Sequence, residues 1–273
     1  MVKRRVRRIV GREVVERIDG IAEETAVALV YNGEPHAVMM ATPLDLEDFA
    51  LGFSLSEGII ADAAELLDVQ TIALEQGVQL SLRIPPQRHE ALMQRPRGLE
   101  GRSGCGVCGT RHIADVLRAP RHAAAGFVVE PVALRRALGE LREQQPLNAL
   151  TGAVHAAAWA TPDGAIQLLR EDVGRHNALD KLIGALAREH RQASHGFAVL
   201  TSRASYEMVL KSASAGIALV VAISAPTSLA IDLADEAGIT LVGFARDDRC
   251  TVYTRPARVH SAAVNVVKPE PSR

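Results

Sequence analysis

The chain lacks the features that mark secreted, membrane-spanning or disordered proteins. It has only 3 cysteines among 273 residues, too few for the disulfide framework of a secreted domain. The longest stretch without a charged residue, 212–231, is interrupted by glycine, proline and serine, so we expect a folded core there and no membrane partner. No apolar run follows the basic N-terminal residues, and we therefore predict a cytoplasmic protein without a signal peptide.

The chain also has almost no net charge. Its 31 lysines and arginines balance 32 aspartates and glutamates, and 48% of the residues are hydrophobic. That composition is typical of a soluble globular protein, and it argues against nucleic acid as a partner. Residues 3–12 are the exception because they contain six basic side chains. We expect a solvated, partly mobile arm there, with an anion-binding arm as the alternative.

An α+β arrangement is predicted for the N-terminal part. Four short strands are expected at residues 25–31, 34–40, 69–73 and 78–84. Asn32-Gly33, between the first two, suits a two-residue hairpin turn. A helix is expected to follow, because Thr42 can cap it, Pro43 suits its first position and Asp45 fits a capping box.

The second half predicts an α/β fold. Apolar strands are expected at residues 165–169, 197–200, 219–223 and 239–244. A helix is predicted over residues 131–143, and another after Thr151, so that His155 lies in an apolar helical stretch. Near-continuous apolar strands that alternate with helices indicate a largely parallel sheet covered on both faces.

A polar loop follows each of the four strands of the second half. The loops are residues 170–177, 201–203, 224–227 and 244–249. Since parallel strands end at one edge of a sheet, these loops are expected to lie together, where ligands of open α/β sheets bind. Hydroxyls, helix N-termini and arginines suit phosphate groups, which points to a nucleotide-like ligand. The candidate binding residues before the last loop are Asp172, His176, Asn177, Ser202 and Arg203. For Asp172 and Asn177, simple helix capping is the alternative.

The densest chemical signal is the run Gly104-Cys105-Gly106-Val107-Cys108-Gly109. It lies in a Gly- and Pro-rich stretch, residues 85–110, that is expected to be a long loop. Two thiols at this spacing can bind one metal, form a disulfide or pass sulfur between them. Nearby Arg102, Arg111 and His112 favour the reactive thiolate. A structural zinc site needs four ligands, and the chain offers one CxxC with a distant Cys250, so we predict no bound metal.

Several ordered segments together resemble the formate dehydrogenase accessory sulfurtransferase family, FdhD. They are CGVCG, REDVGRHNALDK, TSRASYEMVLK and GFARDDR, with the earlier stretch ATPLDLEDFALGFSLSEGII. The resemblance covers about residues 25–255. It implies an N-terminal α+β domain over 1–124 that ends in the CxxC loop, and a second domain over 125–273 with a three-layer fold similar to that of cytidine deaminase.

The same resemblance implies a function. Members of this family take sulfur from a cysteine desulfurase and pass it to the molybdenum cofactor of formate dehydrogenase, bis(molybdopterin guanine dinucleotide), which is the bound substrate. The persulfide position falls on Cys105, with Cys108 assisting; which of them receives sulfur first is open. The family's cofactor-binding stretch falls on Phe244, Ala245, Arg246, Asp247, Asp248 and Arg249. The expected partners are the desulfurase and the catalytic subunit of formate dehydrogenase, and a homodimer is plausible on general grounds.

Two other functions fit parts of the pattern. The protein could be a cofactor-binding chaperone in which the cysteines are structural. It could also be a zinc-dependent enzyme of the deaminase type. Deaminase chemistry requires His-x-Glu and Pro-Cys-x-x-Cys, whereas here Ala157 stands two positions after His155 and Gly104 precedes Cys105. The acid–base glutamate is therefore missing from that position.

Overall fold

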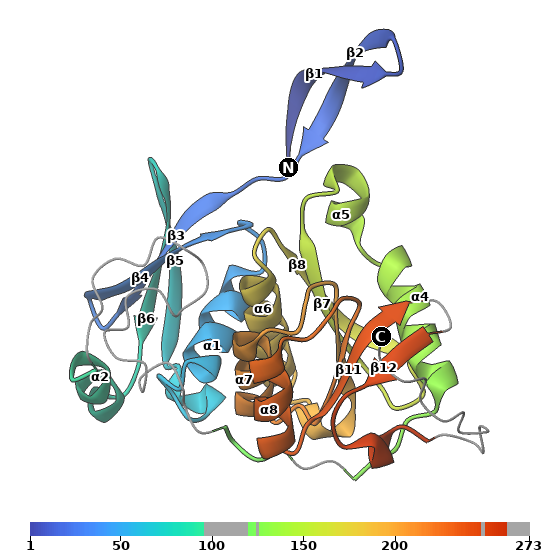
Figure 1. The fold of residues 1–273 in the computed structure, drawn as a ribbon. Coiled ribbons are helices and arrows are strands. Elements are labelled where there is room, and N and C mark those ends of the chain that lie inside the picture. The colour runs from blue at the N-terminus through green and yellow to red at the C-terminus, as the bar shows by residue number, and fades with distance from the viewer. Residues whose placement is uncertain (96–119, 124–125, 247–248, 261–273) are drawn as a thin grey trace.

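The computed structural model describes residues 1–95, 120–123, 126–246 and 249–260. Cys105, Cys108, Asp247 and Asp248 lie outside these ranges. The described chain is a mixed α/β protein with a two-stranded, a four-stranded and a six-stranded sheet (Figure 1). The predicted α/β class is confirmed, whereas the expected boundary near residue 124 stays a prediction.

The four-stranded sheet has the order β4-β3-β6-β5. Its strands are β3 (Thr25–Tyr31), β4 (Glu34–Ala41), β5 (Asp68–Leu74) and β6 (Gly77–Arg83). All four were predicted, and Asn32 and Gly33 make the β3–β4 turn with φ angles of 49° and 91°. Helix α2 (Pro86–Met93) occupies the start of the stretch expected to be a loop, because a proline at its first position and the residues Glu-Ala-Leu-Met favour a helix.

Helix α1 (Leu46–Ser56) begins later than the capping pattern predicts. Thr42 does not cap it, because its hydroxyl accepts a hydrogen bond from the Val173 N–H at 3.1 Å and its own N–H donates to Asp172 at 2.9 Å. Asp45, the residue before the helix, takes a left-handed φ of 52°. Hydrogen bonds from Thr42 to residues 172 and 173 have therefore replaced the predicted helix cap.

The six-stranded sheet is mixed rather than largely parallel. Its order is β12-β11-β10-β9-β7-β8, with the bounds β7 (His155–Ala160), β8 (Ile166–Asp172), β9 (Phe197–Leu200), β10 (Leu219–Ala222), β11 (Thr240–Arg246) and β12 (Arg249–Val252). The central strands β9, β10 and β11 are parallel. β7 is antiparallel to both of its neighbours, and β12 is antiparallel to β11.

Residues 155–160 form strand β7, so the helix expected around His155 is wrong. Four alanines favour a helix by intrinsic propensity, but here the strand is buried on both faces. Ala157 and Trp159 pack in one core cluster with α6, and Ala156 packs with α4 in another. Burial between two helix layers overrides propensity, and the small alanines leave room for both layers.

Helices cover both faces of this sheet. They are α4 (Pro131–Glu143), α6 (Arg175–Arg188), α7 (Tyr206–Ser214) and α8 (Ser228–Glu236). The short helix α5 (Pro146–Thr151) follows α4, and 3-10 turns lie at Ala63–Glu65, Ala193–His195 and Pro256–Arg258. Helices α6, α7 and α8 contribute to one core cluster and α4 to the other. The predicted bounds of α4 are confirmed.

The basic N-terminal arm is a two-stranded ribbon, β1 (Val2–Val10) and β2 (Glu13–Ile21), paired along its whole length. Its side chains are solvated as expected, but the segment is a regular hairpin and not a loose arm. Gly11, with a φ of 61°, makes the turn, and the paired valines and isoleucines favour strands. Figure 1 shows the ribbon projecting from the body of the molecule.

Helices α1 and α6 cross in direct backbone contact and join the two sheets. A Cβ atom on Gly184 would overlap the carbonyl oxygen of Asp48, and one on Gly52 would overlap that of Asp180. Glycine is therefore required at both positions for the two helices to approach this closely.

A Gly184→Ala variant is expected to lose about 1–3 kcal/mol of unfolding free energy, because the added methyl group forces the helices apart. Gly139→Ala in helix α4 is the matched control, since its Cβ would meet nothing within 4 Å, and alanine should stabilise that helix by about 0.5–1 kcal/mol. Urea unfolding measures both. If Gly184→Ala and Gly139→Ala had equal unfolding free energies, helices α1 and α6 could not be in backbone contact at Gly184.

Candidate functional site

The four polar loops do lie at one edge of the six-stranded sheet. Because β8 and β9 are both antiparallel to β7, β8 runs in the same direction as β9, β10 and β11. Their carboxyl ends, together with His155 at the start of β7, therefore share one side. We call residues 172–177, 201–204, 223–227 and 244–246, with His155, the carboxyl edge.

Hydrogen bonds link neighbouring loops of the carboxyl edge. The Thr201 hydroxyl accepts from the Ala156 N–H at 2.8 Å, and Nδ1 of His155 lies 3.4 Å from the same oxygen. The N–H of Thr227 donates to the carbonyl of Ala204 at 3.1 Å, and that of Phe244 donates to Ser224 at 3.1 Å. The loops therefore form a connected surface.

Asp172 and Asn177 hold this surface from inside the protein. Asp172 is fully buried, and its carboxylate accepts hydrogen bonds from Thr42 N, Gly174 N and Asn177 Nδ2 at 2.8–3.0 Å. It also pairs with the buried Lys181 at 2.7 Å, which donates in turn to the carbonyl of Thr42. The two candidates thus tie the carboxyl edge to the β4–α1 loop. Their direct contact with a ligand stays a prediction.

His176 is buried and faces helix α7. Its Nε2 lies 3.8 Å from the carboxylate of Glu207, which also accepts a 2.9 Å hydrogen bond from the Ser205 hydroxyl. The imidazole of His176 lowers the pKa of Glu207 to about 2. Burial lowers the pKa of His155, and the positive charge of Arg175 lowers it further. His155 therefore favours its neutral form at the carboxyl edge.

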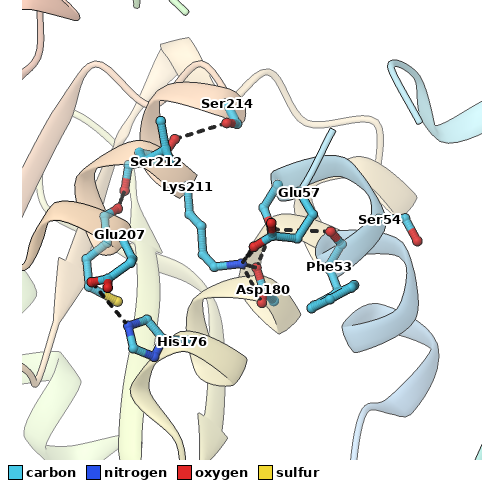
Figure 2. A network of polar contacts seen from close by, with 12 residues as sticks. Phe53, Ser54, Glu57, His176, Asp180, Glu207, Lys211, Ser212 and Ser214 are labelled. Atoms are coloured by element: carbon cyan, nitrogen blue, oxygen red, sulfur yellow. Dashed lines mark hydrogen bonds and ion pairs between the residues drawn. The ribbon is translucent and has the colours of Figure 1, made fainter. Parts of the chain in front are cut away.

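A second pair lies one helical turn deeper, between the same two helices (Figure 2). The ammonium of Lys211 on α7 is 3.0 Å from Asp180 on α6. It also reaches Ser56, the last residue of α1, and Glu57, which follows it, both at 2.9 Å. Burial opposes its charge, but Asp180 and Glu57 outweigh burial and raise the pKa of Lys211. The two pairs therefore hold α6 and α7 to each other, and Lys211, in the last turn of α7, also holds them to the C-terminal end of α1.

The Glu207→Gln variant is expected to be less stable than wild type at pH 7 and equally stable near pH 2. The folded state lowers the pKa of Glu207 from 4.5 to about 2. The stabilisation is therefore complete above pH 4.5 and is lost as the pH falls toward 2. We expect a difference on the order of 1–2 kcal/mol at pH 7, since the side chain is partly exposed.

Urea unfolding at pH 7, 4 and 3 measures that difference. Glu236→Gln is the control, because Glu236 is exposed on α8, and its effect should be small at every pH. A Glu207→Gln difference that stays constant from pH 7 to pH 3 would contradict the role of the charge.

The segment 244–249 was expected to be a loop, but its described residues are the end of β11 and the first residue of β12, because Arg246 pairs with Arg249. It presents an exposed aromatic ring and arginines. Phe244 is 52% exposed and takes a φ of 50°, a left-handed conformation that costs a non-glycine residue energy. Arg203, Arg246 and Arg249 are exposed, and Ala245 and Ser202 are buried. Strained backbone and exposed apolar groups often mark functional positions. Asp247 and Asp248 lie outside the described residues.

Sequence reasoning did not identify Lys181, Lys211 or Glu207. A lysine inside the apolar stripe of a helix was the available signal, since a buried lysine requires a partner. The partners could not be identified from the sequence, because Thr42 and Lys181 are 139 residues apart and Ser56 and Lys211 are 155 apart.

A cavity of about 930 Å³ lies at the C-terminal end of α6 and is lined by both apolar and arginine side chains. We call it the α6 groove. Gly58 and Arg121 line it, and Arg95 donates to the carbonyl of Glu57 beside it at 3.0 Å. Both described flanks of the segment 96–119, which contains the CxxC run, therefore lie at this groove.

Within the described residues, no helix is long and apolar enough to cross a bilayer.

Comparisons with known proteins give one consistent result. The model of the FdhD/NarQ family matches residues 22–260. A protein of Xanthomonas euvesicatoria named sulfur carrier protein FdhD is 58% identical over 258 residues, which cover 94% of this chain and 92% of that one. Its namesake in Cupriavidus necator is 50% identical over 245 residues, covering 90% and 85%.

A crystal structure of a candidate formate dehydrogenase accessory protein from Desulfotalea psychrophila has the same fold. It superposes with a TM-score of 0.74 at 26% identity, and the match covers 95% of this chain and 99% of that one.

Proposed function

The chain belongs to the FdhD/NarQ family, and on that premise we propose that it is a sulfur carrier that serves formate dehydrogenase. It would take persulfide sulfur from a cysteine desulfurase and pass it to the enzyme's molybdenum cofactor, bis(molybdopterin guanine dinucleotide). The observation that carries this proposal is the near full-length match to relatives named sulfur carriers. The cofactor is the substrate of the reaction.

The carrier step requires a nucleophilic thiol, for which Cys105 is our candidate. Its thiolate attacks the terminal sulfur of the desulfurase persulfide. A new S–S bond forms, the old one breaks, and the desulfurase cysteine leaves as a thiolate. Covalent carriage splits one difficult transfer into two easier steps. Cys108, three positions away, would assist or share the sulfur.

The carboxyl edge is our candidate binding site for the cofactor. Arg246 and Arg249 suit its phosphates, because arginine makes paired, charge-assisted hydrogen bonds to phosphate oxygens. The exposed ring of Phe244 offers a flat apolar face of the kind on which a guanine base stacks. The connected loops and the His176–Glu207 pair support the proposal, since they keep the edge in one arrangement.

The length of the chain permits Cys105 to serve both ends of α6. Cys105 lies ten residues after Arg95, and ten extended residues span at most about 36 Å. Helix α6 has 14 residues and is therefore about 21 Å long. The chain between Arg95, beside the α6 groove, and Cys105 is thus long enough for Cys105 to reach the carboxyl edge.

The deaminase-like fold of residues 125–273 remains part of the proposal. It is supported by the sheet with helices on both of its faces. Deaminase chemistry itself is not proposed, because Ala157 occupies the position of the glutamate that it requires.

Intact-mass measurement after incubation with cysteine and a desulfurase tests the proposal. The wild-type protein is expected to gain sulfur-mass increments, which reduction by a thiol should remove. The Cys105→Ala variant should gain none, and Cys108→Ala should gain less than wild type. A wild-type protein that binds the cofactor but gains no sulfur would be a chaperone and not a carrier.

A further inference from the structure

The β1–β2 ribbon is a sheet of its own, separate from the two larger sheets. No third strand joins it in the part of the chain that the structure describes, and an isolated two-stranded hairpin is marginally stable in water. It meets the body near its base, where Gly20 packs against the carbonyl of Leu150. The ribbon also precedes residues 22–260, which the family model matches.

The tip of the ribbon is apolar and open to solvent. Ile9 and Val14 are cross-strand neighbours on one face and are 73% and 61% exposed. Val10 and Val15 lie on the other face and are also exposed. Ile18 is exposed nearer the base, beyond the Arg7–Glu16 pair. Four exposed apolar side chains gathered at one tip are typical of a surface that another protein covers.

The shaft of the ribbon is strongly basic, although the whole chain has a formal charge of -1. Strand β1 carries the exposed residues Lys3, Arg4, Arg5, Arg7 and Arg8. Strand β2 carries three acids and one arginine. The ribbon therefore has a net positive charge, and a second copy of it would be repelled. The apolar tip and the acids on β2 disfavour nucleic acid, which leaves an acidic protein surface as the complementary partner.

The ribbon rises beside the carboxyl edge. Strand β3 follows it directly, and Thr25 at the start of β3 pairs with Ala41 at the end of β4. The next residue, Thr42, bonds to Asp172 and Val173 of the carboxyl edge. Figure 1 shows the ribbon on the side of the molecule at which β8 ends. A protein held by the ribbon would therefore lie over the proposed cofactor site.

We propose that the ribbon is a docking arm for the catalytic subunit of formate dehydrogenase. Its apolar tip inserts into an apolar depression with an acidic rim, and the basic shaft pairs with that rim. The identity of this partner rests on the proposed function, because the protein that takes the cofactor must approach the edge that holds it. The sulfur donor instead meets the cysteine segment, whose described flanks lie at the α6 groove.

The docking arm is tested by immobilising the full-length protein and measuring the Kd for purified formate dehydrogenase catalytic subunit. The Ile9→Ser/Val14→Ser variant removes the apolar tip, and Arg5→Glu/Arg8→Glu reverses charge while leaving the tip intact. Each is expected to raise the Kd at least tenfold, and the charge variant should also reduce the salt dependence of binding. The control Val132→Ser/Arg135→Glu alters exposed residues of α4 and should change the Kd less than twofold.

Sulfur uptake by the same samples separates this proposal from the proposed function. All variants should still gain sulfur from the desulfurase, which also shows that they are folded. An unchanged Kd in both ribbon variants would overturn the docking arm, as would a loss of desulfurase binding or of self-association in place of formate dehydrogenase binding. Wild-type protein that gains sulfur but does not bind the subunit would overturn the arm and count against formate dehydrogenase as the recipient, while sulfur carriage itself would stand.

Discussion

Replacing Lys211 by methionine is expected to lower the free energy of unfolding by about 3–5 kcal/mol, because it leaves a buried carboxylate without its cation. Lys211 is 5% exposed and Asp180 about 1%. Methionine fills a similar volume, so the effect would reflect the charge and not a cavity. Glu57 is partly exposed and can turn to solvent, but Asp180 cannot.

Chemical unfolding at pH 7 measures the loss, and two further variants show its cause. Arg136→Met breaks an exposed ion pair with Glu140 and Asp163, and it should cost less than about 1 kcal/mol. Lys211→Met combined with Asp180→Asn removes the orphaned charge and should recover part of the stability. If Lys211→Met costs no more than Arg136→Met, the buried pair does not hold the three helices together.

Replacing Cys105 by alanine is expected to abolish formate dehydrogenase activity in cells that lack the wild-type protein. The carrier step has no second route if Cys105 alone accepts the persulfide. Cys108→Ala is expected to retain part of the activity. The measurement is formate oxidation in extracts, at matched levels of this protein and of formate dehydrogenase.

The third cysteine of the chain provides the matched control. Cys250 lies on β12, and partial burial raises the pKa of its thiol, which disfavours the reactive thiolate. Cys250→Ala should therefore leave formate dehydrogenase activity unchanged. Full activity in Cys105→Ala, or equal losses in Cys105→Ala and Cys250→Ala, would contradict the assignment of the carrier cysteine.

The predictable parts of the fold are those in which local pattern and tertiary context agree. The helix over 131–143 has an apolar stripe and a proline at its first position, and its predicted bounds match α4. Residues 155–160 were misassigned because alanine favours a helix, while the segment is buried between two helix layers as a strand between β9 and β8. The start of α1 was misassigned because Thr42 bonds to residues 130 and 131 positions away.

The meeting of the four polar segments at one edge was predicted correctly, although the sheet is not largely parallel and His155 was not expected there. Strand ends meet at one edge whenever the strands run in the same direction, even if they are not neighbours. β8 and β9 are both antiparallel to β7, so β8 runs in the same direction as β9. The buried pairs behind the edge could not be predicted, since each joins residues from distant parts of the chain. The role of the cysteines rests on the family, because two thiols with this spacing also suit a metal or a disulfide.

Transfer of radiolabelled sulfur through purified components tests the sulfur-carrier proposal most directly. Labelled cysteine and desulfurase would charge this protein, which would then be separated and mixed with formate dehydrogenase whose cofactor lacks its sulfido ligand. We predict that the label moves from Cys105 to the cofactor and that formate oxidation rises in proportion. Label that stays on this protein while the enzyme becomes active, or that reaches the cofactor equally well with the Cys105→Ala variant, would contradict the proposal.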